Sequence, residues 1–309
     1  MNSQRALIPM AWTRALLEER EVRTPEGTFI LTLEREDLSP LYPTMERYTL
    51  TLWAGKRAAA VFRTNTYEYS PTVGLDPLSV ARQRARQWEE GLKDDPLEFL
   101  AYLKKIPLRA PPALPLTDVV VVQGSPRADG NCSILAGWVA EEVRASGKSV
   151  QVLYPDDMDI HPCIGCYQCY NTGTCTFDDE MEGVVRALRY ARLLIVCSPV
   201  YTNTVPAGLK ALIDRCQALH ATLNFTGRRI RMEVVCGLLL GVCGRQGQEN
   251  FACLTQVVEV FMENLGITVA GMVLVDGVDR VRDIRTIPGL EGRVRAVVQT
   301  ALSTSCSPS

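Results

Sequence analysis

Histidine is almost absent from this chain, whose 309 residues include only two. Many hydrolases depend on histidine–carboxylate or serine–histidine sets. With so few histidines, we do not expect hydrolytic chemistry of that kind. An excess of either charge is also lacking, because 33 basic side chains stand against 35 acidic ones, for a net charge of −2. No overall field attracts nucleic acid or an anionic membrane, and we expect neither as a partner.

Long apolar runs are missing as well. Pro9, Arg14 and Glu18 interrupt the first twenty residues, which do not form the apolar stretch of a signal peptide. Nowhere do eighteen apolar residues run together, so we expect no membrane-spanning helix. Cysteine, by contrast, is plentiful, and its count of eleven is odd for a secreted disulfide framework. We therefore expect a cytoplasmic protein with reduced thiols.

Four cysteines stand within thirteen residues, in the run CIGCYQCYNTGTC, and they are Cys163, Cys166, Cys169 and Cys175. Four thiolates so close together can bind one small inorganic group, and a [4Fe–4S] cluster is the first candidate. Zinc is the competitor, although structural zinc sites usually pair two Cys-x-x-Cys hooks across a longer gap. The third interpretation is that these thiols bind nothing.

A proline-rich stretch divides the chain. Four prolines between Ile106 and Asp118 predict an extended connector, since proline removes backbone donors and disfavours helix before it. We place a small α+β domain at residues 1–110, a linker at 111–117 and a second domain at 118–309. In the first domain, β-branched and aromatic segments predict strands, and two segments with proline near their start predict helices. The expected strands are 28–36, 46–54 and 57–63, and the expected helices are 77–91 and 96–105.

Apolar strands alternate with helices after the linker, and the first strand, VVVV, is apolar enough to be buried on both faces. The expected strands are 118–124, 149–155, 191–199, 234–244 and 268–277; the helices are 133–146, 180–190, 205–219, 248–265 and 291–302. This alternation predicts an α/β fold with a doubly wound, five-stranded parallel sheet. Asp178 and Asp179 precede a helix, and we expect them to cap it.

In such a sheet, ligands bind outside the carboxyl ends of the strands, where the strand order reverses. The segment GSPRADGNCS after the first strand combines glycines, polar side chains, Arg127 and a following helix N-terminus, which suits a phosphate group. The alternative is a turn in which Asn131 or Ser133 merely caps the helix. The segment SPVYTNTVP offers Tyr201 to a flat heterocycle, unless it is an ordinary surface loop, and GVCGRQGQE is rich in glycine. We expect these loops and the cysteine run to be neighbours at one edge of the sheet.

The segments GSPRADGNCS, CIGCYQCYNTGTCTFDDEM and SPVYTNTVPAGLKALIDR resemble motifs of the iron–sulfur flavoproteins, a branch of the flavodoxin-like NAD(P)H-dependent FMN reductases. The resemblance covers about residues 117–300 by the alternation of strands and helices. It implies that the FMN phosphate is held by Ser125, Arg127, Asn131, Cys132 and Ser133. It implies ring contacts by Pro199, Val200, Tyr201, Thr202, Asn203 and Gly244, and cluster ligation by Cys163, Cys166, Cys169 and Cys175. Cys132 stands where the family usually has a hydroxyl, and a thiol is a weaker donor.

The resemblance also implies a function, that of an FMN-dependent oxidoreductase. The [4Fe–4S] cluster would exchange electrons with FMN, the donor would be a ferredoxin-like protein or NAD(P)H, and a small molecule would accept the electrons. No acid or base residue is required, so we name no catalytic residue. A homodimer or homotetramer is expected from the family. Two alternatives remain: a cluster-free NAD(P)H-dependent flavin or quinone reductase, and a redox-responsive binding protein that acts through its N-terminal domain.

Overall fold

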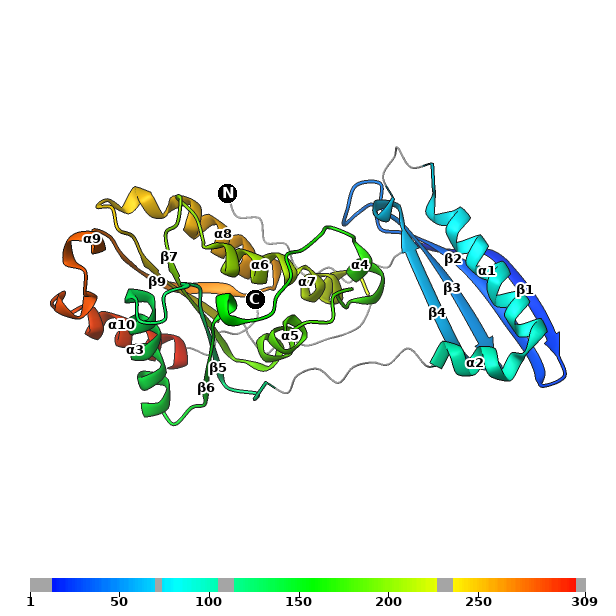
Figure 1. The fold of residues 1–309 in the computed structure, drawn as a ribbon, viewed down its shortest axis with the longest axis horizontal. Helices are drawn as coiled ribbons and strands as arrows, with labels where there is room; N and C mark the ends of the chain where they lie inside the picture. The colour runs from blue at the N-terminus through cyan, green and yellow to red at the C-terminus, as the bar shows by residue number, and fades with distance from the viewer. Residues whose placement is uncertain (1–12, 70–73, 105–113, 227–235, 304–309) are drawn as a thin grey trace. The chain divides into compact units, whose positions relative to one another are not determined.

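A computed structural model describes residues 13–69, 74–104, 114–226 and 236–303. Residues 111–113 of the predicted linker lie outside these ranges. The chain forms two compact units (Figure 1), and the first combines residues 1–109 with residues 165–174, while the second contains residues 110–164 and 175–309. The whole cysteine run was expected in the second domain, but the two units divide it. Cys166 and Cys169 belong to the first unit, and Cys163 and Cys175 belong to the second.

The first unit is an antiparallel four-stranded sheet in the order β1-β2-β3-β4. Its strands are β1 (Thr13–Thr24), β2 (Gly27–Asp37), β3 (Glu46–Ala54) and β4 (Arg57–Asn65). Its helices are η1 (Thr66–Glu68), α1 (Pro77–Asp94), α2 (Pro96–Lys104) and α4 (Gln168–Thr172). Apolar side chains of the strands alternate and pack against α1 and α2, with Leu31, Leu50 and Trp88 among the buried residues.

Strand β1 was not predicted from the sequence. Its centre reads EEREVR, and glutamate and arginine are not typical of strands. In the structure it is an edge strand paired with β2 alone, and its charges are satisfied by ion pairs, such as Arg20 with Glu18 and Glu89. An edge strand tolerates such charges because one side of it faces solvent.

The second unit confirms the predicted fold class. Its parallel strands are β5 (Val119–Gln123), β6 (Val150–Leu153), β7 (Leu193–Pro199), β8 (Cys236–Val242) and β9 (Thr268–Val275). They run in the order β6-β5-β7-β8-β9, which is the flavodoxin-like arrangement. The shorter helices are η2 (Pro155–Asp157), η3 (Gln248–Phe251), α9 (Val278–Val281) and η4 (Ile284–Thr286). After β6 is added on one side of β5, the later strands are added on the other side, so the strand order reverses between β5 and β7.

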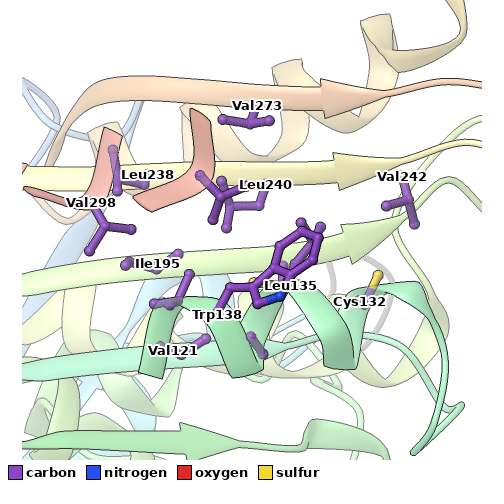
Figure 2. Packing of buried hydrophobic residues seen from close by; sticks show 14 of the residues in the cluster. Val121, Cys132, Leu135, Trp138, Ile195, Leu238, Leu240, Val242, Val273 and Val298 are labelled. Carbon is purple, nitrogen blue, oxygen red and sulfur yellow. The ribbon is translucent and has the colours of Figure 1, made fainter. Parts of the chain in front are cut away.

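Helices cover both faces of this sheet. One face bears α3 (Asn131–Ala145) and α10 (Leu290–Ser303); the other bears α5 (Met181–Tyr190), α6 (Ala207–Arg215), α7 (Gln217–Asn224) and α8 (Ala252–Asn264). Figure 2 shows Leu135 and Trp138 of α3 on the same face as Ile195 and Leu240 of the strands. Alternate valines of β5 serve the two faces, which explains the unbroken apolar run. The helix predicted at 205–219 is in fact two helices, α6 and α7, which meet at Cys216.

Within the described ranges, every helix falls short of the combined length and apolarity that a bilayer crossing requires.

Candidate functional site

A cavity of about 580 Å³ opens at the carboxyl ends of the strands in the second unit. It is formed by the loops after β5, β7 and β8, together with α9, and β5 and β7 flank the point where the strand order reverses. The structure thus brings the three loops singled out in the sequence to one place. Ten of the eleven residues assigned to the cofactor line this cavity: Ser125, Arg127, Asn131, Cys132, Pro199, Val200, Tyr201, Thr202, Asn203 and Gly244. The eleventh, Ser133, does not.

The loop between β5 and α3 is shaped by Gln123, a residue that sequence analysis missed. Its amide is completely buried, and its Oε1 accepts a 2.6 Å hydrogen bond from the backbone N–H of Ser125. Its Nε2 donates to Oγ of Ser133 at 2.8 Å, and that hydroxyl donates in turn to the backbone carbonyl of Arg127. Ser133 therefore supports the loop from behind instead of facing the cavity. A glutamine that ends an apolar buried strand is the signal that could have identified this role.

Helix α3 begins at the cavity without a side-chain cap. Its N-cap is Gly130, which has no side chain to accept a hydrogen bond from the backbone N–H groups of the first turn. Oδ1 of Asn131 accepts instead from the backbone N–H of Ile284 at 3.3 Å. The alternative in which Asn131 or Ser133 caps the helix thus does not describe this loop. An uncapped helix N-terminus favours an anion, through its free N–H groups and the helix dipole.

Arg127 and Cys132, both assigned to the cofactor from the sequence, lie at this helix start. Arg127 is exposed, and among the described residues it has no ion-pair partner. Cys132 is buried, and burial raises the pKa of its thiol to about 12. The thiol is therefore neutral at physiological pH and adds no negative charge beside an anion. Its side chain also packs in the apolar cluster between α3 and the sheet, as Figure 2 shows.

The loop after β7 is a tight two-residue turn. The backbone N–H of Tyr201 donates to the carbonyl of Thr204 at 2.8 Å, and the reverse bond is 3.0 Å. The two central residues, Thr202 and Asn203, have φ values of 44° and 68°. A β-branched residue such as threonine rarely adopts this left-handed conformation, so the surrounding contacts must hold the turn. Such strain is concentrated at ligand-binding sites, and this turn borders the cavity.

The loop after β8 needs glycine at position 244. A Cβ atom there would lie 2.3 Å from Oδ2 of Asp279, another residue of the cavity wall. The loop and α9 are joined by backbone hydrogen bonds, including one from Val278 N–H to the carbonyl of Cys243 at 3.0 Å. The absence of a side chain at Gly244 thus lets α9 close against the loop.

In the second unit, Arg215 anchors both ends of the cysteine run. Its guanidinium binds Asp179 through two hydrogen bonds of 2.5 and 2.8 Å, and both side chains are buried. It also donates to the carbonyl of His161 at 2.7 Å, hydrogen-bonds Cys175 and lies over the ring of Phe177. Burial works against ionised Asp179, but the hydrogen bonds and charge of Arg215 bring the pKa of that carboxyl below its usual range. Asp179 accepts from the N–H of Met181, but the N-cap of α5 is Glu180 and lacks a side-chain cap. The prediction that Asp178 and Asp179 cap this helix was therefore wrong, and the main partner of Asp179 is Arg215.

The four cysteines of the run form no disulfides, and Cys163 is exposed while the other three are half-buried. Four cysteine sulfurs match the donor set that iron–sulfur clusters and zinc prefer. Among the residues that the structure describes, no three histidine, cysteine, aspartate or glutamate side chains are grouped closely enough to hold a metal ion. The residue types of the run, and not a grouping of their side chains in the structure, fit a cluster. The cavity with its uncapped helix fits a phosphate-bearing cofactor.

Comparison with known proteins agrees with this geometry. The family model of the NADPH-dependent FMN reductases matches residues 117–278. An iron–sulfur flavoprotein of Methanocaldococcus jannaschii is 30% identical over 132 residues, which are 43% of this chain and 66% of that protein. An iron–sulfur flavoprotein of Methanosarcina thermophila is 31% identical over 150 residues, 48% of this chain and 75% of that protein.

Among solved structures, the NAD(P)H:quinone oxidoreductase from Methanothermobacter marburgensis aligns with 62% of this chain and 99% of its own length. Its sequence identity is 14% and the TM-score is 0.45, so this likeness carries no argument about activity. The family match and the two sequence relatives carry the assignment. The chain therefore belongs to the NADPH-dependent FMN reductase family and is an FMN-dependent oxidoreductase related to the iron–sulfur flavoproteins.

Proposed function

We propose that this protein holds FMN in the cavity of the second unit and a [4Fe–4S] cluster on Cys163, Cys166, Cys169 and Cys175, and that it passes electrons between them to reduce a small acceptor. The observation that carries the proposal is the start of α3. An uncapped helix N-terminus beside an exposed arginine faces a cavity at the carboxyl ends of parallel strands. This combination favours a phosphate group on a cofactor.

The residues of the cavity would divide the work of binding. The first turn of α3 and Arg127 would hold the phosphate, with Ser125, Asn131 and Cys132 shaping that end. The Tyr201–Thr204 turn and Gly244 would line the part of the cavity that receives the flavin ring. Bound FMN supplies reversible one- and two-electron chemistry, while the protein binds it and controls access to it. No side chain is needed as acid or base.

The four cysteines would serve as the cluster ligands. Support comes from the donor set, from the absence of disulfides at these four cysteines and from the names of the two sequence relatives. The electron donor would be a ferredoxin-like protein or NAD(P)H, and the enzyme would act as a homodimer or homotetramer. Among the described cysteines, nine are outside disulfides and Cys236 is disulfide-bonded. Because most cysteines are thiols, which suits a reducing compartment, we propose a cytoplasmic location, without nucleic-acid or membrane partners.

A cluster-free NAD(P)H-dependent flavin reductase is the second candidate. The description of the matching family favours it, because that family is defined by NADPH and FMN and not by a cluster. In this case NAD(P)H alone would reduce the flavin, and loss of a cysteine from the run would leave turnover intact.

Anaerobic purification followed by iron, sulfide and flavin assays tests the proposal. We expect iron and acid-labile sulfide in equal amounts, together with FMN. Cys166→Ala should lose iron and keep flavin, while Cys253→Ala, which changes an exposed thiol outside the cysteine run, should keep its iron. Full iron content in Cys166→Ala would contradict the ligand assignment. Flavin reduction by NADPH in an iron-free variant, at the rate of the unchanged protein, would favour the second candidate.

A further inference from the structure

The middle of the cysteine run is built into the first unit. The chain leaves the second unit at residue 165 and returns to it at residue 175, and the segment between contains Cys166, Cys169 and helix α4. This ten-residue segment packs against β3, β4 and η1, and its polar groups find partners there. A domain of no evident chemistry thus provides the surroundings of two thiols.

Asn65 and Glu68 make the central contacts. Nδ2 of Asn65 donates to Oδ1 of Asn171 at 2.9 Å and to the carbonyl of Tyr167 at 3.3 Å. The carboxylate of Glu68 accepts from Nε2 of Gln168 at 2.9 Å and from Nδ2 of Asn171. Asn65 and Asn171 are completely buried. Because buried polar groups must be paired, this network fixes α4 in one position on the sheet.

Two arginines hold the backbone of the same segment. Arg47 is buried, and its Nη1 donates to the carbonyl of Tyr170 at 2.8 Å. Arg63 donates through Nη1 to the carbonyl of Asn171 at 3.0 Å. These carbonyls lie in the last turn of a helix only five residues long, where acceptors lack intrahelical donors. The arginines therefore replace the helix turns that α4 does not have.

The residue between the thiols is strained. Tyr167, which directly follows Cys166, has a φ value of 56° and is the left-handed N-cap of α4. Its ring contacts the rings of Tyr67 and Tyr170, each at a centroid distance of 5.2 Å, and of Tyr42 at 6.2 Å. A bulky residue adopts this conformation only where its surroundings impose it. Here the tyrosine cluster and the Asn65 hydrogen bond impose it.

We infer that the first unit is a scaffold that holds the Cys166–Cys169 hook in a fixed left-handed turn, with Asn65 and Glu68 as its positioning residues. The inference depends on the proposed function only for the identity of what the thiols bind. Preorganised ligands bind metal more tightly, because the entropy of ordering the loop has already been lost. The unit would thus act through these contacts, without touching the bound group.

Hydrogen exchange of the whole protein, without iron, provides the first test. Glu68→Gln keeps the size of the side chain but replaces one carboxylate oxygen by an N–H donor that faces other donors. Exchange in residues 165–174 should become about tenfold faster or more, since a buried polar contact is lost. Glu90→Gln, on the exposed face of α1 in the same unit, should leave it unchanged. Amides of β2 and β3 serve as the internal reference for the folding of the unit.

A second variant tests the contact from the other side. Asn171→Asp places a carboxylate against Glu68, so residues 165–174 should again exchange faster. Asn171→Asp should accelerate exchange less in the Glu68→Gln background than in the wild-type background, because the repulsion between two carboxylates is then removed. The inference is overturned if neither variant changes exchange in the segment, or if the change appears only together with equal acceleration in β2 and β3.

Reconstitution with iron and sulfide measures iron uptake, which should not change if Glu68 and Asn171 serve only the stability of the unit. Both variants should take up less iron than the Glu90→Gln protein while they bind FMN equally well. Faster exchange with undiminished iron uptake would overturn the positioning role. If the unchanged protein takes up no iron, the cluster in the proposed function fails, and the exchange experiment alone still decides whether the first unit holds the hook.

Discussion

Arg47 and Glu36 form an ion pair inside the first unit, with Nε and Oε2 2.6 Å apart and the two side chains 1% and 2% exposed. Arg14 binds the other oxygen of Glu36 at 2.8 Å. The pair leaves Nη1 of Arg47 directed at the carbonyl of Tyr170. One buried ion pair thus connects the core of the sheet to the segment that carries Cys166 and Cys169.

The first prediction concerns the removal of this pair. Glu36→Gln should lower the free energy of unfolding of the first unit by about 3–5 kcal/mol at neutral pH, because Arg47 becomes a buried charge without its counterion. Native-state hydrogen exchange of β2 and β3 measures this quantity separately from the second unit. Glu21→Gln, which breaks an exposed pair with Arg23, is the control and should leave the stability of the unit nearly unchanged.

The same pair has a pH dependence of known sign. Burial opposes ionisation of Glu36, but the hydrogen bond and charge of Arg47, with Arg14 and Arg63, bring its pKa below the usual value. A lowered pKa in the folded state gives stability that is present above the unfolded pKa of about 4.3 and is lost as pH falls through the folded pKa. The difference between wild type and Glu36→Gln should therefore shrink in acid. A difference that grows in acid would contradict this assignment.

The second prediction concerns the start of α3. Arg127→Gln should weaken FMN binding about 10- to 100-fold, as expected for the loss of a hydrogen bond between charged groups. Fluorescence titration of the flavin-free protein with FMN measures the change. Arg144→Gln, an exposed arginine in the last turn of the same helix, removes the same charge at the far end. Equal weakening by both variants would indicate a general charge effect instead of a phosphate contact.

The third prediction tests the wall of the cavity. Gly244→Ala should displace Asp279 and weaken FMN binding about tenfold, since overpacking costs about 1–3 kcal/mol. Asp279→Ala in the same chain should restore most of the affinity, because it removes the atoms that the new Cβ meets. Gly292→Ala on α10 meets nothing within 4 Å and serves as the matched glycine control. Failure of Asp279→Ala to restore binding would contradict the steric explanation.

The fourth prediction concerns Arg215. Arg215→Met should destabilise the second unit by about 3–5 kcal/mol, since Asp179 is left buried and unpaired. Alkylation of Cys175 should also become faster, because Arg215 no longer holds that end of the run. Denaturant unfolding and mass spectrometry measure the two effects. Lys210→Met, on the exposed face of the same helix, breaks only a surface pair with Asp214 and should change neither.

The sequence was informative where function depends on short segments. The parallel five-stranded sheet of the second unit followed from the alternation of apolar strands and helices, and three loops were selected by their glycines, prolines and polar residues. These features are local, so the chain displays them directly. The turn at Thr202 and Asn203 was not foreseen. Asparagine adopts φ above zero more readily than most residues, but threonine rarely does, so the contacts of the loop must impose the conformation of Thr202.

The contacts between segments far apart in the chain could not be predicted. Gln123 and Asn65 act through buried hydrogen bonds, and in the sequence each is a single polar residue without a motif. Arg215 ends the segment SPVYTNTVPAGLKALIDR, but nothing local indicates that it binds Asp179. Asn65 and Asn171 are separated by 106 positions. Helix α4 is too short for a periodic pattern, and its left-handed N-cap is a tyrosine, which gives no signal for such a turn. The division of the cysteine run between two units therefore emerged only from the structure.

This division delays the completion of the first unit during synthesis. Residues 1–109 are translated first, and the last residue that completes their unit, Thr174, follows about 65 residues later. At translation rates of about 5–20 residues per second, the interval is about 3–13 s. Throughout it, the nascent sheet presents Arg47, Asn65 and Glu68 without the segment that satisfies them. The polar surface of the nascent first unit thus stays without its partners for seconds, long enough for chaperones to bind it before residues 165–174 are synthesised.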